Sequence, residues 1–304
     1  MNRQVLDLSR KIECEPNEIK LVVACRNEER RLPEFFEWYR NLGVTKFFVV
    51  NNGSTDRTSD IINAQPDAYE FYTEESYSDL LGSNWLMELL NEYCLEGWTV
   101  IVDTDEFLVY PHSEEVDLHQ LTAYFDQKGE VAMAGGMLGM YSKKPIRETE
   151  TFAECEYFDK EFNVAYCDKF FKVNGVQYRA FGQTLYLAKV PLAKYSKNMV
   201  VTAHFLTSIS TGKSIPRSKV SSVSLHYKFL KDFITRVPEE ALREKHWENA
   251  ALYKKAATKL GMRPNLSLYH KNHSVKYEGW EQLVRLGWME TTEEFEEYVR
   301  TLKK

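Results

Sequence analysis

The chain has 304 residues, of which 43% are apolar and 13% aromatic; this composition is typical of a folded globular protein and excludes a disordered one. Its net charge of −6 and isoelectric point near 5.8 argue against a nucleic-acid-binding protein, which normally carries a basic face. A chain of this length suits one sizeable domain with an appendage, or two domains.

The sequence predicts a protein of the cytoplasm. It contains no apolar run of about 18 residues, so no membrane-spanning helix is expected. Its N-terminal stretch lacks the apolar core of a signal peptide. The five cysteines are scattered, odd in number and without a CxxC pair, which favours a reducing compartment.

The first half of the chain alternates between strand and helix patterns. Residues 20–25 and 46–50 are continuous apolar runs that predict buried strands, and between them an apolar helix face ends at Gly43. Alternation at this spacing predicts parallel strands joined by right-handed crossovers. Ser54 and Asp56 are suitable caps for a helix that starts near residue 58.

The pattern continues with a short strand over 68–72, a helix over 83–95 and a strand over 98–102. Residues 237–261 are strongly helix-forming, with Pro238 suited to a helix start. We therefore predict a first domain over residues 1–230 and a helical C-terminal appendage over residues 231–304.

The most informative feature is an acidic motif at the end of the strand over 98–102. Asp103 and Asp105 follow that strand, at the edge where open α/β sheets bind ligands. Two carboxylates this close repel each other unless a cation lies between them. The motif therefore predicts half of a divalent metal site, and the alternative is a solvated acidic turn.

Three stretches together resemble the family 2 glycosyltransferases: residues 22–29, 49–58 and 103–107. The closest likeness is to the bacterial branch whose acidic motif reads Asp-x-Asp-Glu-Phe. The likeness extends over nearly the whole chain, in order and spacing. The further matching stretches are 157–159, 179–181, 189–192, 202–204, 225–230, 244–247, 274–277 and 283–287.

Two positions depart from the family pattern. Many members carry Asp-Asp where this chain has Asn51 and Asn52, and an aspartate there is expected to accept a hydrogen bond from uracil. Asparagine can accept through its carbonyl oxygen but can also donate, so the identity of the base is less well determined. The branch usually shows a double glycine where this chain has Asn174 and Gly175.

The resemblance implies a GT-A fold, which is a Rossmann-like, mostly parallel sheet flanked by helices. It implies a metal-dependent, inverting transfer of sugar from a nucleoside-diphosphate sugar, UDP-linked by preference, to a hydroxyl of a glycan or lipid-linked acceptor. Hard oxygen ligands suit Mn²⁺ or Mg²⁺. Asp105 is expected to bind the metal, Asp103 the metal or the ribose, and His226 is the third ligand by resemblance. Its alternative role is a half-buried structural ring.

The nucleotide-binding candidates lie in loops at the ends of predicted strands or at a helix start, and each has a structural alternative. Helix capping or turn chemistry is the alternative for the loop residues and the helix-start residue, and a surface ion pair is the alternative for the arginine. The candidates are Asn27, Glu28, Asn52, Asp56, Asn84, Asp103 and Arg179.

An inverting mechanism needs one carboxylate to accept the proton of the acceptor hydroxyl. Asp159 is the first candidate for this base, Asp168 the second, and Glu156 a third. The alternative for each is a solvated acid.

Two other functions compete with glycosyl transfer. A haloacid-dehalogenase-type phosphohydrolase also places Asp-x-Asp after an apolar strand, with the first aspartate as nucleophile. A non-catalytic sugar- or nucleotide-binding module can keep the fold without the chemistry. Peripheral membrane contact through the C-terminal helices, at the inner membrane face, stays open, and the sequence does not indicate an oligomeric state.

Overall fold

The computed structural model describes residues 4–77, 82–161, 163–167, 169–173, 175–182, 187–202, 206–243 and 247–303. Two compact units make up the chain. Unit 1 comprises Met1–Gly135, Lys189–Ser222 and Met289–Lys304, and unit 2 comprises Gly136–Ala188 and Val223–Trp288. In the parts of the chain that the structure describes, no helix is both long and apolar enough to cross a membrane.

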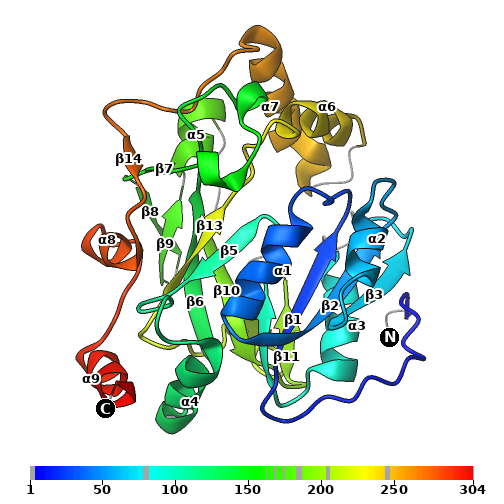
Figure 1. Ribbon diagram of the computed structural model, residues 1–304, viewed down its shortest axis with the longest axis vertical. Helices are drawn as coiled ribbons and strands as arrows, with labels where there is room; N and C mark the ends of the chain where they lie inside the picture. The colour runs from blue at the N-terminus through cyan, green and yellow to red at the C-terminus, as the bar shows by residue number, and fades with distance from the viewer. Residues whose placement is uncertain are drawn as a thin grey trace. The chain divides into compact units, whose positions relative to one another are not determined.

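Strands and helices alternate through the first half of unit 1, as Figure 1 shows. The main sheet has the hydrogen-bonded strand order β3-β2-β1-β4-β10-β6-β13-β5. In chain order, the elements of unit 1 and the strands of this sheet are β1 (Ile19–Cys25), α1 (Leu32–Asn41), β2 (Val44–Asn52), α2 (Thr58–Asn63), β3 (Ala68–Thr73), α3 (Ser83–Tyr93), β4 (Trp98–Ile101), β5 (Glu106–Val109), α4 (Leu118–Lys128), β6 (Ala132–Gly139), β10 (Ala188–Lys194), β11 (Met199–Val201), β12 (Leu206–Ser208), β13 (Ser222–His226) and α9 (Glu293–Leu302).

The strand order of unit 1 contains a topological switch point. β1 pairs in parallel with β2 on one side and with β4 on the other, and β2 pairs in parallel with β3. The chain therefore moves outward from β1 to β3 and then returns to the far side of β1 as β4. In open α/β sheets the ligand crevice lies at such a point, beyond the carboxyl ends of the two strands. Here those ends lead into the loop after Cys25 and the acidic motif after Ile101.

Helices α1 and α3 cover opposite faces of this sheet. Phe47 of β2 packs edge-on against Phe36 of α1 with ring centroids 5.0 Å apart. The next residue, Phe48, stacks at 4.9 Å on Tyr93 of α3. Because successive strand side chains point to opposite faces, these two contacts place the helices on the two sides of the sheet. The apolar runs over β1 and β2 are consequently buried on both faces.

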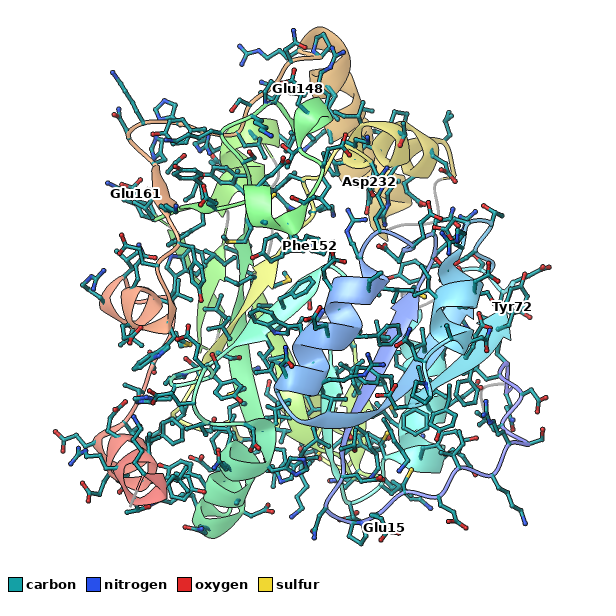
Figure 2. All side chains as sticks on the ribbon, viewed as in Figure 1. Glu15, Tyr72, Glu148, Phe152, Glu161 and Asp232 are labelled. Carbon is teal, nitrogen blue, oxygen red and sulfur yellow. The ribbon has the colours of Figure 1, made fainter. Side chains whose placement is uncertain are left out.

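Unit 2 contains a two-stranded antiparallel sheet, a hairpin and a helical region. Phe152, labelled in Figure 2, packs against Tyr227 with ring centroids 5.0 Å apart, and Phe229 packs against Phe233 at 5.2 Å. The elements are the 3₁₀ turns η2 (Ile146–Glu148) and η3 (Phe152–Glu154), β7 (Tyr157–Asp159), β8 (Asn163–Cys167), β9 (Lys169–Val173), α5 (Gly175–Phe181), α6 (Phe233–Arg243), α7 (Trp247–Met262), β14 (Ser274–Lys276) and α8 (Trp280–Arg285).

The helix start predicted at Pro238 is wrong. Helix α6 begins at Phe233 and contains the proline in its interior. Phe233 and Val237 are buried in one apolar cluster with Leu260 of α7. Burial of these side chains offsets the lost backbone hydrogen bond at the proline and extends the helix by a turn and a half.

The predicted fold class is confirmed: the protein is an α/β protein with a Rossmann-like, mostly parallel sheet flanked by helices. Helices α6 to α9 all lie in the C-terminal region predicted to be helical. The domain boundary predicted between residues 230 and 231 stays a prediction.

Candidate active site

The loops that follow β1 and β2 are tied to each other by side chains. Asn27 has a φ of +54°, a left-handed conformation that asparagine tolerates better than most residues. Its backbone N–H donates to Ser54 Oγ at 3.0 Å, and its Oδ1 accepts from the backbone N–H of Thr55 at 2.8 Å. Asn27 therefore joins the loops after β1 and β2 to each other, and its role in nucleotide binding stays a prediction.

Glu28 and Asp56 make further hydrogen bonds between these two loops. The backbone N–H of Glu28 donates to Thr58 Oγ1 at 2.8 Å, while its carboxylate pairs with Arg31 at 3.2 Å in a buried position. Asp56 accepts from the backbone N–H of Thr58 at 3.0 Å and from that of Glu29 at 3.2 Å. Asp56 thus performs the turn chemistry that was its structural alternative, whereas the helix-capping alternative for Glu28 is wrong, because no side chain makes a capping hydrogen bond at the start of α1.

The side chain of Asn52, at the end of β2, is oriented by its two amide hydrogens. Its Nδ2 donates to the carbonyl oxygens of Thr73 at 3.1 Å and Glu75 at 3.0 Å. Both donor hydrogens are therefore used, and what the side chain can offer a ligand is its carbonyl oxygen. The neighbouring Asn51 is buried and accepts from the backbone N–H of Ser54 at 3.0 Å.

The acidic motif forms a turn rather than a continuation of the strand. β4 ends at Ile101, and the backbone N–H of Glu106 donates to the carbonyl oxygen of Asp103 at 3.1 Å. The Glu106 carboxylate accepts in return from the backbone N–H of Asp103 at 3.2 Å. Within this turn the Asp103 side chain is 58% exposed, and Asp105 is half-buried. Both predicted metal-binding carboxylates of unit 1 thus lie in one turn at the switch point.

Lys189 of β10 is the charge partner of this turn. β10 pairs antiparallel with β4, and the register of Leu192 with Val100 places Lys189 opposite Asp103. Its Nζ lies 2.9 Å from the carboxylate of Asp103 and 2.6 Å from that of Glu106, and its side chain is only 6% exposed. Burial lowers the pKa of Lys189, but the two carboxylates outweigh it and the pKa is raised.

Three carboxylates and one lysine are gathered at this turn. Asp103, Asp105 and Glu106 carry three formal negative charges, and Lys189 carries one positive charge. The backbone beside the turn is held by Tyr39, whose hydroxyl donates to the carbonyl oxygen of Glu106 at 2.9 Å. The formal charges of these four residues sum to −2, a balance that favours binding of a divalent cation.

The donor set fits a magnesium or manganese ion that is shared with a substrate. Among the residues that the structure describes, no three His, Cys, Asp or Glu side chains are grouped to hold a metal ion. Mg²⁺ is usually bound through one or two carboxylates together with substrate phosphates, rather than by a cage made of protein alone. Asp103 and Asp105 meet that requirement, and their metal-binding role stays a prediction.

In unit 2, the buried Asp159 forms an ion pair with the half-buried Arg179, a connection that the sequence did not indicate. Arg179 donates from Nε to one carboxylate oxygen of Asp159 at 2.8 Å and from Nη2 to the other at 2.7 Å. The Tyr141 hydroxyl also donates to this carboxylate, and Arg179 donates to the carbonyl oxygen of Leu268 at 2.7 Å. The Asp159 side chain is 7% exposed. The first candidate for the catalytic base and the arginine among the nucleotide-binding candidates are therefore partners of each other.

The remaining candidates are distributed over both units. His226 is the half-buried last residue of β13, and its carbonyl oxygen accepts from the backbone N–H of Met140 at 3.0 Å. His226 belongs to unit 2, so its role as third metal ligand stays a prediction. Asp168 lies outside the described residues. Glu156, the third base candidate, pairs with Lys276 at 2.6 Å on the surface.

Asn84 does not cap its helix. The N-cap of α3 is Gly82, which has a φ of +70°, and no side chain makes a capping hydrogen bond there. Asn84 is the second residue of the helix and is half-buried. The structural alternative for Asn84 as the N-cap is therefore wrong, and its role in nucleotide binding stays a prediction.

The role of Lys189 in the site was not predicted from the sequence. Its position at the start of the apolar run over 190–193 could have indicated one. A charged side chain in a buried strand needs a partner of opposite charge, and the acidic motif is the nearest one on the neighbouring strand.

No protein-family model and no curated protein matches the chain. Among solved structures, Staphylococcus aureus TarS 1–349 is 17% identical over 44% of this chain and 41% of that chain, with a TM-score of 0.32. The 4-diphosphocytidyl-2C-methyl-D-erythritol synthase from Anaerococcus prevotii is 12% identical over 94% and 96%, with a TM-score of 0.27. An apo UDP-glucose pyrophosphorylase is 9% identical over 82% and 88%, with a TM-score of 0.24. Likeness at this level does not extend to function.

Proposed function

We propose that this protein is a metal-dependent, inverting glycosyltransferase that moves a sugar from a nucleoside-diphosphate sugar to a hydroxyl of a glycan or lipid-linked acceptor. The observation that carries the proposal is the acidic turn at the switch point of the sheet, with its formal charge of −2 and an exposed Asp103. A nucleoside diphosphate leaving group gains negative charge, and a bound Mn²⁺ or Mg²⁺ supplies Lewis-acid stabilisation of that charge.

The residues of the turn have distinct proposed roles. Asp105 and Asp103 hold the metal, and Asp103 also reaches the ribose. Lys189 holds one oxygen of Asp103 and limits the excess charge of the turn. Rigid positioning of this kind contributes to catalysis because the groups need no reorganisation during the reaction.

Asn52 supports a donor whose base carries an imino N–H, as uracil does. Its amide hydrogens are committed to backbone carbonyls, so its carbonyl oxygen acts as an acceptor in the same way as the aspartate of other family members. We therefore propose a UDP-linked donor. Cytosine and adenine present a ring nitrogen without hydrogen at the equivalent position, and we expect them to bind less well.

The base that accepts the proton of the acceptor hydroxyl remains a proposal among the carboxylates of unit 2. Asp159 is held by Arg179 and Tyr141, and any catalytic use of its carboxylate requires that one of these contacts is exchanged for the acceptor. Asp168 is the second candidate.

An assay of donor turnover tests the proposed function. Release of nucleoside diphosphate from a panel of UDP-, GDP-, CDP- and TDP-sugars is measured with candidate acceptors. We expect activity with one UDP-sugar that is lost in excess chelator and restored by Mn²⁺. Asp105→Asn should lower it at least about 100-fold, since the change removes a charged metal ligand. Asp60→Asn, which removes an exposed carboxylate from α2 of the same unit, is the matched control. Full activity of Asp105→Asn in chelator would refute the proposal.

One observation favours a second candidate, a phosphohydrolase. The ammonium of Lys189 touches Asp103, the first aspartate of the motif, which would be the nucleophile in that chemistry. A neighbouring cation also stabilises a transferring phosphoryl group. Turnover of an aryl phosphate that is lost in Asp103→Asn, with no turnover of nucleotide sugars, would select this candidate.

A further inference from the structure

The two units carry opposite charge. Unit 1 has 20 Lys and Arg residues and 31 Asp and Glu residues, whereas unit 2 has 19 and 14. A protein with a net charge of −6 is therefore divided into a strongly acidic unit and a basic one. A charge asymmetry of this size indicates that the basic unit meets an anionic partner.

The positive charge of unit 2 is concentrated in one part of its sequence. No Asp or Glu occurs from residue 249 to residue 277, although acidic residues are frequent elsewhere. Four basic residues fall between the middle of α7 and the residue directly after it. They are Lys254, Lys255, Lys259 and Arg263.

Two of these residues, Lys254 and Lys255, lie on the face of α7 that points away from its packing partners, whereas Lys259 is half-buried at the flank of the helix and Arg263 is an exposed residue directly after it. Ala256 and Leu260 are buried and face the apolar cluster shared with α6. At 100° per residue, Lys254, Lys255 and Met262 lie on the opposite side of the helix, and all three are exposed. Figure 1 shows α7 next to α6.

Two large apolar side chains of α6 and α7 are exposed as well. The two most exposed large apolar residues in the described part of the chain are Leu242 at 85% and Met262 at 75%, and they belong to α6 and α7. A soluble polyanion has no apolar region in which such side chains could be buried. The boundary between head groups and acyl chains of a membrane buries them and also attracts lysine and arginine.

We propose that the exposed face of α7, formed by Lys254, Lys255 and Met262, together with the half-buried Lys259 at its flank and Arg263 directly after the helix, is a docking surface for a membrane that contains anionic phospholipid. The basic side chains lie over the phosphate groups, and Met262 enters the interface. Each basic residue near an anionic bilayer contributes about 1 kcal/mol, which is about fivefold in the partition coefficient.

Sedimentation of the full-length protein with lipid vesicles tests the proposal. Vesicles of phosphatidylcholine alone are compared with vesicles that also contain phosphatidylglycerol, at low and at high salt. We expect binding to the anionic vesicles only, and loss of that binding at high salt because surface charges are screened. Lys255→Gln, Lys259→Gln and Arg263→Gln combined should weaken binding about 100-fold. Met262→Ser should weaken it about fivefold to tenfold through lost burial.

The control removes the same amount of charge from the acidic unit. Lys11→Gln, Lys197→Gln and Lys213→Gln combined change three exposed lysines of unit 1 and should leave vesicle binding unchanged. Circular dichroism establishes that each variant is folded, and a Lys255→Arg, Lys259→Arg variant should bind as the wild type does. Equal binding of both triple variants would overturn the proposal. So would an absence of binding to anionic vesicles, or binding to a soluble polyanion in place of vesicles.

Discussion

Each unit contains an ion pair that joins separate elements and has at least one buried member, and the two pairs differ in how accessible their carboxylates are. In unit 1, the buried Lys189 contacts Asp103 and Glu106, and the Asp103 side chain is exposed. In unit 2, Arg179 makes a bidentate contact with the buried carboxylate of Asp159, which also accepts from the Tyr141 hydroxyl. An accessible carboxylate can bind a ligand, whereas an enclosed carboxylate held by two partners is the property of a structural contact.

The largest effect on stability is expected in unit 2. Asp159→Ala removes the carboxylate and leaves the guanidinium of Arg179 without its bidentate partner. We expect a loss of about 3 kcal/mol in the free energy of unfolding, measured by urea denaturation. Glu161→Gln, which changes an exposed carboxylate two residues away, should shift it by less than about 0.5 kcal/mol. An Asp159→Ala protein as stable as the wild type would refute the structural role.

Lys189→Met should lower the free energy of unfolding by about 2 kcal/mol, which is less than the effect of Asp159→Ala. The substitution removes the cation beside two carboxylates, of which Glu106 is buried but Asp103 is still solvated. It should also weaken nucleotide binding in the presence of Mn²⁺, since Asp103 loses the contact that orients it. Lys194→Met on the same strand removes a surface pair with Asp126 and is the matched control. Equal effects of the two substitutions would show that Lys189 has no special part in the site.

Tyr141→Phe removes one hydroxyl from the enclosed pair of unit 2 without changing its charge. The hydroxyl donates to Asp159 and lies 2.8 Å from Ser274 Oγ. We expect a loss of about 1 kcal/mol, measured by urea denaturation. Tyr178→Phe, in an exposed tyrosine of α5, should leave the stability unchanged. If Tyr141→Phe lost as much free energy of unfolding as Asp159→Ala does, the ion pair of Asp159 with Arg179 would not be the main stabilising contact of this group.

The Tyr141 hydroxyl should also contribute to the pH dependence of stability. Burial, and then the nearby carboxylate of Asp159, raise the pKa of Tyr141 above its ordinary value of 10. A raised pKa means that the contribution to stability is fully present below pH 10 and is lost as the pH rises beyond it, because the unfolded chain then releases the proton first. The wild type should therefore lose more stability than Tyr141→Phe when the pH is raised through 10. Identical losses would contradict the raised pKa.

The fold was predictable from sequence to the extent that local patterns decide it. The apolar runs over β1, β2 and β4 and the helix faces of α1 and α3 have periodicities that fix the type of element. The start of α6 was not predictable in this way, because burial of Phe233 and Val237 outweighs the local effect of Pro238. Tertiary packing overrides propensity wherever a buried side chain lies beyond a breaking residue.

The candidate site was predictable where its residues are close in sequence. Asp103 and Asp105 stand together in the motif, and the structure keeps them in one turn. The pairing of Asp103 with Lys189 depends on the register of β10 against β4, and that of Asp159 with Arg179 on the packing of α5. Both connect positions 20 or more residues apart, and no local pattern carries that information.

Calorimetric titration of UDP establishes whether nucleotide binding needs a metal held by Asp105, with the wild type, Asp105→Ala and Asp60→Asn each measured in Mn²⁺ and in chelator. We expect that the wild type and Asp60→Asn bind UDP only with the metal, and that Asp105→Ala loses at least about 100-fold in affinity. UDP binding of equal strength in chelator, or an unchanged affinity of Asp105→Ala, would contradict the proposed metal site.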